Sequence, residues 1–243
     1  MNKGTLILAV FIYTAFFSSM AFTCQQEEEN YAQLRKRMVE RQLAARDITD
    51  PAVLKVMGEV PRHMFVRPDD RHLAYNDYAL PIEEGQTISQ PYIVALMTQH
   101  LVVKRGDKVL EVGTGSGYQA AVLAHLVDEV YSVEIKDHLA KRATELFKDL
   151  DYKNVHVKVG DGYRGWAEHA PFDAVIVTCA ASRIPPLLLE QLKEGGRLVI
   201  PIDQTPYYQT LTRVTKKDGK PVIERITDVR FVPMTGEIRK KKK

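Results

Sequence analysis

The chain has 243 residues, 45% of them hydrophobic and 27% charged, which is typical of a globular protein and excludes a disordered chain. The formal net charge of +3 is due to the C-terminal tail, residues 239–243, whose five positive charges leave 3 − 5 = −2 for the remainder. The folded part is therefore not basic, and we expect no nucleic acid partner. The two cysteines, Cys24 and Cys179, provide neither a disulfide framework nor a metal cluster, so we expect no metal site.

An apolar run from Thr5 to Phe22 follows Lys3 and resembles a bacterial export signal. We predict that residues 1–23 are a signal-like or membrane-anchor segment, since about 18 apolar residues are just enough to span a bilayer. Positive charges shortly after the run would keep the following domain on the cytoplasmic side of such an anchor. A cytoplasmic location is therefore predicted, with or without a tether through residues 4–22. The alternative is a periplasmic protein or an envelope lipoprotein made through residues 1–24.

Residues 24–106 are predicted to form a largely helical cover. Asp50 followed by Pro51 is a helix cap with proline in the first turn, and Ser89 or Gln90 is placed to cap a later helix. Together with the spacing of apolar positions, these signals predict helices over residues 30–46, 51–58 and 91–101, a short helix near 69–73 within an irregular stretch over 61–84, and a loop over 85–91.

The second half alternates between apolar strands and helices, which is typical of a doubly wound parallel sheet. Strands are predicted near residues 108–112, 129–135, 155–159, 172–179 and 197–202, and helices near 117–126, 137–150 and 184–193. The dipeptide Asp218-Gly219 predicts an antiparallel hairpin with arms over 208–217 and 222–232. We therefore expect one α/β, Rossmann-like domain over 24–238, with a helical N-terminal cover and a cofactor-binding sheet over 107–238.

A glycine-rich turn between the strand at 108–112 and the next helix predicts a nucleoside cofactor. Its glycines follow the pattern G-x-G-x-G, and Tyr118 stands where a dinucleotide site would have its third glycine. Glu111 would repel a pyrophosphate but would suit a cation, so S-adenosylmethionine fits better than a dinucleotide. Glu134, at the end of the next strand, is placed to accept the two hydroxyls of a ribose. The predicted turn consists of Glu111, Gly113, Thr114, Gly115, Ser116 and Gly117.

Two further segments each have a functional and a purely structural interpretation. Asp161-Gly162 follows the third strand of the sheet, where the acid can accept a hydrogen bond from an adenine amino group, but the same dipeptide is also a common turn. In the stretch from Thr87 to Ser89, free N–H groups at the start of a helix favour a carboxylate, but Ser89 can equally be a helix cap.

The segments Gly85-Gln-Thr-Ile-Ser-Gln-Pro-Tyr-Ile-Val-Ala95 and Val109-Leu-Glu-Val-Gly-Thr-Gly-Ser-Gly-Tyr-Gln119 together resemble the protein-L-isoaspartate O-methyltransferase family. The resemblance covers about residues 34–238. It implies a class I methyltransferase fold and methyl transfer from S-adenosylmethionine to isoaspartyl residues of damaged proteins and peptides, which starts their repair through a succinimide. A monomer is expected.

The resemblance also implies a role for individual residues. Ser89 would be the active-site serine with Thr87 beside it, and Gln90, Pro91 and Val232 would contact the substrate. The glycine turn and Glu134 would hold the cofactor, with Asp161 and Gly162 at the adenine. Thr235 would close over the site.

Three rival functions remain to be weighed. A nucleic-acid methyltransferase should show a basic face and, for base-amino targets, an Asn/Asp-Pro-Pro-aromatic loop, where this chain has residues 180–187. A dinucleotide dehydrogenase is disfavoured by Tyr118. A non-enzymatic envelope protein is suggested only by the N-terminal segment. A class I methyltransferase acting on another carboxylate or on nucleic acid therefore stays as the alternative.

Overall fold

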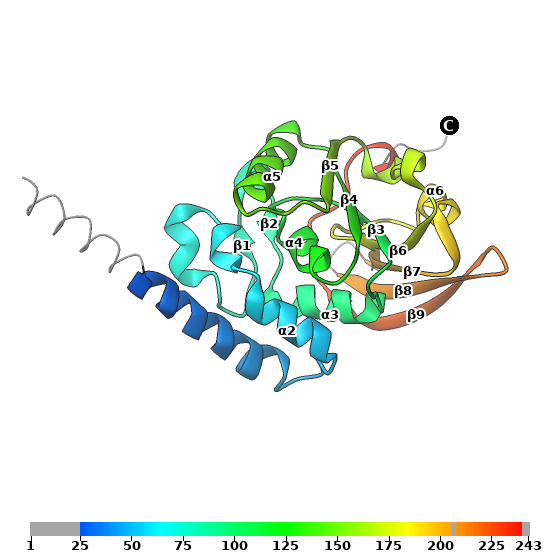
Figure 1. Cartoon of the computed structure of the whole chain (residues 1–243). Helices are drawn as coiled ribbons and strands as arrows, with labels where there is room; N and C mark the ends of the chain where they lie inside the picture. The colour runs from blue at the N-terminus through cyan, green and yellow to red at the C-terminus, as the bar shows by residue number, and fades with distance from the viewer. Residues whose placement is uncertain (1–24, 206–207, 240–243) are drawn as a thin grey trace, which may run out of the picture.

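The protein is built around a seven-stranded sheet in which five neighbouring strands are parallel (Figure 1). This computed structural model describes residues 25–205 and 208–239, so the predictions for residues 1–24 and the tail from 240 lie outside it. The strand order is β5-β4-β3-β6-β7-β8-β9, with β8 and β9 antiparallel at one edge. The strands are β3 (Lys108–Val112), β4 (Glu129–Glu134), β5 (Val155–Val159), β6 (Phe172–Val177), β7 (Leu192–Asp203), β8 (Gln209–Lys217) and β9 (Lys220–Val229). The predicted α/β fold class is confirmed.

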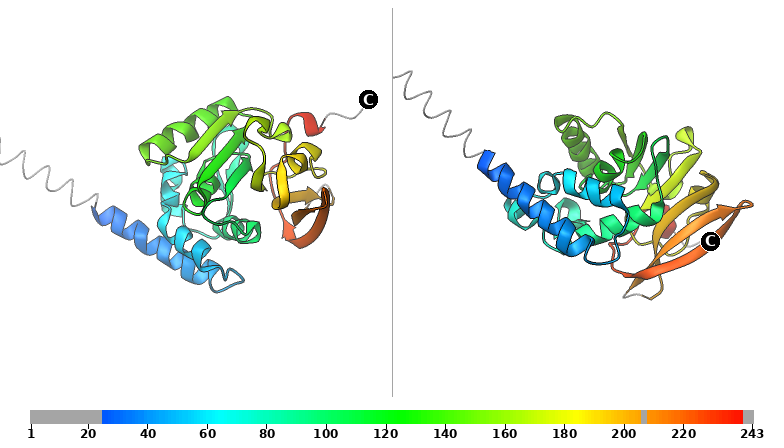
Figure 2. Two further views of the ribbon diagram at one scale, coloured as in Figure 1. Left: turned by 45° about the vertical axis from the view of Figure 1, so that its right-hand side comes forward. Right: turned by 60° about the horizontal axis from the view of Figure 1, so that its bottom comes forward.

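Helices cover both faces of this sheet, as the turned views in Figure 2 show. The first described helix spans residues 25–38 and continues as the π-helical turn η1 (Val39–Leu43). The longer helices that follow are α2 (Pro51–Glu59), α3 (Pro91–Leu101), α4 (Tyr118–Ala124), α5 (Asp137–Asp149) and α6 (Pro186–Glu190). The 3-10 turns are η2 (Arg62–Met64), η3 (Pro68–Leu73), η4 (Glu83–Gly85), η5 (Gly162–Arg164), η6 (Ala167–His169) and η7 (Glu237–Arg239).

Alternation along the central strand β3 separates two apolar cores. Val109 packs in the larger core with residues of α2, α3, α4 and α5, whereas Leu110 and Val112 pack in the smaller one with residues of α6 and the C-terminal segment. Because successive side chains of a strand point to opposite faces, Glu111 points to the same face as Val109 and is enclosed by the larger core.

Two predicted elements differ in the structure. The helix predicted over 184–193 is reduced to α6, because Leu192 already pairs with Phe172 in the sheet and β7 begins there. The predicted loop over 85–91 contains the short strand β2 (Thr87–Ile88), which pairs antiparallel with β1 (Leu80–Pro81). This two-stranded ribbon places Thr87 on an ordered support beside the main sheet.

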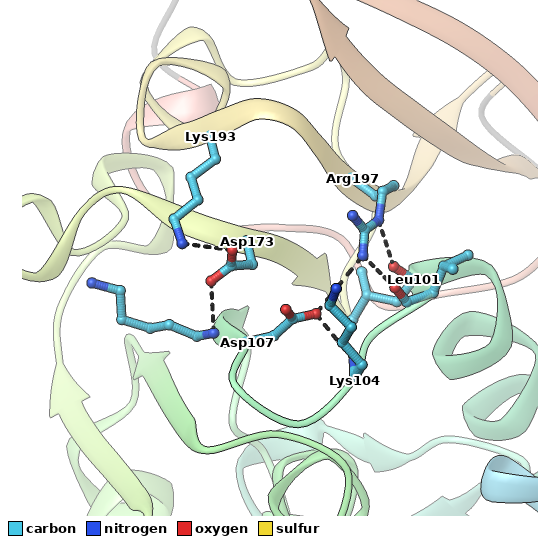
Figure 3. A network of polar contacts seen from close by, with 8 residues as sticks. Leu101, Lys104, Asp107, Asp173, Lys193 and Arg197 are labelled. Carbon is cyan, nitrogen blue, oxygen red and sulfur yellow. Dashed lines mark hydrogen bonds and ion pairs between the residues drawn. The ribbon is translucent and has the colours of Figure 1, made fainter.

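A polar network fixes the end of α3 to the amino-terminal ends of the strands (Figure 3). Arg197 Nε donates to the carbonyl oxygen of Leu101 at 3.0 Å, and its Nη2 lies 3.9 Å from Asp107 Oδ2. Asp173 accepts hydrogen bonds from the backbone N–H of Lys108 at 2.9 Å and from Lys193 Nζ at 2.6 Å. The helix that begins next to Ser89 is therefore anchored to the sheet at its far end.

Candidate active site

A pocket opens at the carboxyl ends of β3, β4 and β6, where the chain order of the sheet reverses. Open α/β sheets bind their ligands at such a reversal. The pocket is open to solvent, and its free space including the mouth is about 800 Å³. Its apolar wall includes Val112, Val133 and Ile135, and the glycine turn forms its floor.

The glycines of this turn are required by backbone conformation and by space. Gly113 has φ +100°, and a Cβ there would lie 2.5 Å from Thr178 Oγ1. Gly117 has φ +89°, and a Cβ there would lie 2.9 Å from the Phe147 ring. Side chains at these positions would be strained and would collide with neighbours. Gly113, Thr114, Gly115 and Ser116 line the pocket, whereas Gly117 packs against α5 behind them.

Glu134 lies at the pocket wall, as the sequence predicted for a ribose ligand. Its side chain is 6% exposed. Oε2 accepts from the Gly115 N–H at 2.9 Å and Oε1 accepts from the Lys136 N–H at 2.9 Å. Each carboxylate oxygen can accept a further hydrogen bond, so the group is oriented and still able to receive ribose hydroxyls. Lys136 also lines the pocket and pairs with Glu84 of η4 at 3.4 Å.

Glu111 lies beneath the turn and does not line the pocket. It is fully buried and forms a short hydrogen bond with the hydroxyl of Ser132, which in turn lies 2.6 Å from Thr114 Oγ1. Within the described part of the chain, its Oε1 has no hydrogen-bond partner. Burial, and then the nearby charge of Glu134, raise the pKa of Glu111 to about 8. Burial behind the turn therefore favours the protonated form of this carboxyl group.

Of the adjacent residues Asp161 and Gly162, only Gly162 lines the pocket. A Cβ on Gly162 would lie 2.3 Å from Val112 Cγ1, so only glycine fits. Asp161 lies behind it, where its carboxylate accepts from the N–H groups of Tyr163 at 3.0 Å and Glu237 at 2.7 Å. The acid thus ties η5 to the C-terminal segment, whose Thr235 is an exposed part of the pocket lining.

Thr87 and Ser89 line this pocket and a second, more open cleft beside it. Thr178 and Val232 also line both cavities, so these four residues mark the junction between them. The capping role weighed for Ser89 is not found, because the N-cap of α3 is Gln90 and no side chain caps that helix end.

The other two predicted substrate residues lie at the start of α3. Gln90 lines the open cleft, and its Nε2 donates to Asp77 Oδ1 at 2.8 Å and to the Asp77 carbonyl oxygen at 3.0 Å. Pro91 is buried as the first residue of α3 and lines neither cavity.

The sequence reasoning missed Thr178, which follows β6 at the same edge of the sheet as the glycine turn. Its hydroxyl donates to the carbonyl oxygens of Gly113 at 2.6 Å and Val112 at 3.1 Å, which fixes the turn. A polar residue at the carboxyl end of a parallel strand was the available signal. Lys136 had a similar signal, since it comes just after β4.

Comparison with known proteins identifies the family. The family model described as Protein-L-isoaspartate(D-aspartate) O-methyltransferase (PCMT) matches residues 33–239. The chain belongs to this family. It is 59% identical over 203 residues to the protein-L-isoaspartate O-methyltransferase of Opitutus terrae, covering 84% of this chain and 87% of that one. It is 49% identical over 236 residues to protein-L-isoaspartate O-methyltransferase 2 of Shewanella sediminis, covering 96% and 97%.

Two solved structures from the same family superpose on this chain. One protein-L-isoaspartate O-methyltransferase superposes with a TM-score of 0.76 at 31% identity, covering 84% of this chain and 67% of that chain. A putative protein-L-isoaspartate O-methyltransferase from Plasmodium falciparum, solved in complex with S-adenosyl-L-homocysteine, superposes with a TM-score of 0.73 at 30% identity, covering 83% and 98%. The family assignment predicted from the two sequence segments is confirmed.

Proposed function

We propose that this chain transfers a methyl group from S-adenosylmethionine to the free α-carboxylate of L-isoaspartyl residues in damaged proteins and peptides. The product ester closes to a succinimide, which returns part of the material to normal aspartate. The observation that carries the proposal is the junction formed by Thr87, Ser89, Thr178 and Val232, which line both the inner pocket and the open cleft. A cofactor in the inner pocket and a peptide in the cleft would meet there.

The residues around the inner pocket fit the cofactor. Glu134 would accept the ribose hydroxyls, and the turn from Gly113 to Ser116 would approach the cofactor with backbone atoms. Gly162 and Val112 pack against each other and both line the pocket, where an adenine would lie against them. The carboxylate of Asp161 holds the turn at Gly162 through its hydrogen bond from the Tyr163 N–H. We assign the covering role to Thr235 at the pocket mouth.

The chemistry requires placement rather than a general base. A carboxylate with a pKa of about 4 is ionised at neutral pH and is already nucleophilic. The bound cofactor supplies a methyl group on a positively charged sulfur. With the cofactor held by the glycine turn and Glu134, the carboxylate oxygen would bond to the methyl carbon as the carbon–sulfur bond breaks and its electron pair goes to sulfur. We assign to Ser89 the task of orienting the carboxylate in line with that bond, with Thr87 beside it.

The test is methyl transfer to two peptides that differ only in one isoaspartyl or normal aspartyl residue. Base-labile methylation of the isoaspartyl peptide alone supports the proposal. Transfer to neither peptide, with cofactor still bound, would refute it and favour another carboxylate or nucleic acid as the substrate.

A variant pair tests the role of the serine. Ser89→Ala should lower kcat by about 5- to 150-fold, since a lost hydrogen bond costs about 1–3 kcal/mol, and should leave the affinity for S-adenosylhomocysteine unchanged. The exposed Ser182 provides the control variant Ser182→Ala. Equal kinetics of the two variants would contradict the assignment.

We further infer one methyltransferase domain over residues 24–238, acting as a monomer in the cytoplasm. Within residues 25–205 and 208–239, no helix is long and apolar enough to cross a membrane. The tether through residues 4–22 is tested by fractionating cells that produce the full chain, with protease protection to report the side of the membrane. A released periplasmic product would contradict the cytoplasmic assignment. Light scattering of the purified protein tests the monomer.

A further inference from the structure

Arg62 in η2 is a charged residue with no exposed surface. Its Nε donates to the carbonyl oxygen of Ala74 at 2.7 Å, and its Nη2 donates to the carbonyl oxygen of Ser89 at 2.7 Å. The guanidinium carbon lies 4.8 Å from the centre of the Tyr118 ring. The side chain therefore runs through the core of the N-terminal cover to the backbone of the junction serine.

Among residues 25–205 and 208–239, the charge of this arginine has no counter-ion. No carboxylate of the described residues lies within the 4.0 Å of a salt bridge to it, and its Nη1 has no hydrogen-bond partner among them. Burial lowers the pKa of Arg62 to about 10, so the group remains a cation at neutral pH. A buried cation without a counter-ion is costly for a fold, and the two hydrogen bonds to carbonyl oxygens offset only part of that cost. Packing alone therefore does not account for an arginine here.

Arg62 contacts residues that line the inner pocket and the open cleft. Ser89, whose carbonyl it holds, lines the inner pocket and the open cleft, and Tyr118, over which it stacks, lines the inner pocket. The arginine lines neither cavity itself, so it cannot contact the reacting atoms directly. Its field nevertheless acts across the apolar core, where charges are weakly screened.

We propose that Arg62 is a positioning residue for methyl transfer: it fixes the backbone of Ser89, and as a buried cation without a counter-ion it favours a carboxylate at that serine. The inference rests on the proposed function, because it assigns the attraction for the carboxylate that the proposed reaction needs. It predicts that the preference of the site for a charged over a neutral substrate group depends on Arg62.

The preference is measured with two peptides, one carrying the isoaspartyl α-carboxylate and one carrying the corresponding α-carboxamide. Binding of each to the full chain saturated with S-adenosylhomocysteine is measured by calorimetry, and the ratio of the two dissociation constants is compared between variants. Arg62→Met should reduce the preference for the carboxylate at least tenfold. Arg62→Lys should keep most of the preference and lower kcat, because the charge remains while the two planar contacts, one to Ala74 and one to Ser89, are lost.

A second arginine serves as a matched control. Arg35 is 12% exposed and lies 4.0 Å from Glu28; it donates to the carbonyl oxygen of Gly58 at 2.9 Å and to the hydroxyl of Tyr75 at 3.1 Å. Within the described part of the chain it forms no hydrogen bond or ion pair with the junction residues. Arg35→Met should lower the melting temperature while leaving the ratio of dissociation constants unchanged. A purely structural role of Arg62 would give the same pattern in Arg62→Met, and that outcome would overturn the proposal.

A measurement on the wild-type protein covers the case in which Arg62→Met does not fold. With arginine labelled by ¹⁵N, the Arg62 signals are those missing from the Arg62→Lys spectrum. The carboxylate peptide should shift them and the carboxamide peptide should not; equal shifts, or none, refute the inference. Methyl transfer by the wild-type protein is measured first. If the wild type methylates the isoaspartyl peptide and only the charge preference is missing, then the inference fails while the proposed function stands.

Discussion

The buried carboxyl group of Glu111 makes a sharp prediction about stability and pH. The substitution Glu111→Gln keeps the size of the side chain and an acceptor for the Ser132 hydroxyl, but it removes the titration. In the wild type the pKa is about 8 in the folded state, against 4.5 for an ordinary glutamate. Between these values the folded protein holds a proton that the unfolded chain has lost. The folded state then binds more protons, and the wild-type protein loses stability as the pH rises from 4.5 to 8.

The size of the effect follows from the shift. At pH 7 the difference is 7 − 4.5 = 2.5 pH units, or on the order of 3 kcal/mol of unfolding free energy at about 1.36 kcal/mol per unit. Glu111→Gln should therefore be more stable than the wild type by an amount that grows from pH 5 to pH 8. This is the reverse of the usual loss when a buried polar group is replaced.

Urea unfolding at pH 5, 6, 7 and 8, without cofactor, measures the difference. The surface variant Glu145→Gln, at an exposed position of α5, controls for the change in net charge. A difference between Glu111→Gln and wild type that is constant over this range, or that shrinks with rising pH, would refute the assignment of a protonated buried carboxyl group.

Three further outcomes are expected. Gly117→Ala should lower the unfolding free energy by about 1–3 kcal/mol more than Gly219→Ala in a melting experiment, because both have positive φ but only Gly117 faces the Phe147 ring; equal losses would contradict this. Burial, then nearby arginines, lower the pKa of His63 to about 4, so its neutral form contributes stability above its ordinary pKa of 6.5 that is lost as the pH falls towards 4. His63→Phe should therefore flatten the acid side of the stability profile, and an unchanged profile would count against it. Glu83→Gln breaks the ion pair between η4 and α5, which restrains the loop beside the pocket, and should speed dissociation of S-adenosylhomocysteine several-fold in stopped flow. High salt should have the same effect in the wild type. A dissociation rate unaffected by either change would rule out this restraint.

The fold was largely predictable because its strands carry local signals. The strands at 108–112 and 155–159 lie at the predicted residues, and Asp218 and Gly219 form the predicted hairpin turn with positive φ at both positions. The end of α6 was not predictable, because the competing event is the pairing of Leu192 with a strand twenty residues earlier. Local helix signals do not contain that contact.

In the candidate site, too, local features were predictable and tertiary contacts were not. The positions of the glycine turn and of Glu134 at the strand ends were predictable, because backbone conformation and strand ends can be inferred from neighbouring residues. The burial of Glu111 and the contact between Arg62 and Ser89 depend on how the helical cover packs, and residues 27 positions apart meet there. Sequence patterns of single elements do not report such contacts.

The ribbon formed by β1 and β2 has a consequence for the order of events in a turnover. Thr87 in the ribbon and Ser89 just after it line both the inner pocket and the cleft. The turn of the ribbon forms ion pairs with α5 and with the loop after β4. A peptide lying in the cleft would cover the inner pocket on the side of these shared residues. The cofactor should therefore enter before the peptide, and the methylated peptide should leave before S-adenosylhomocysteine does.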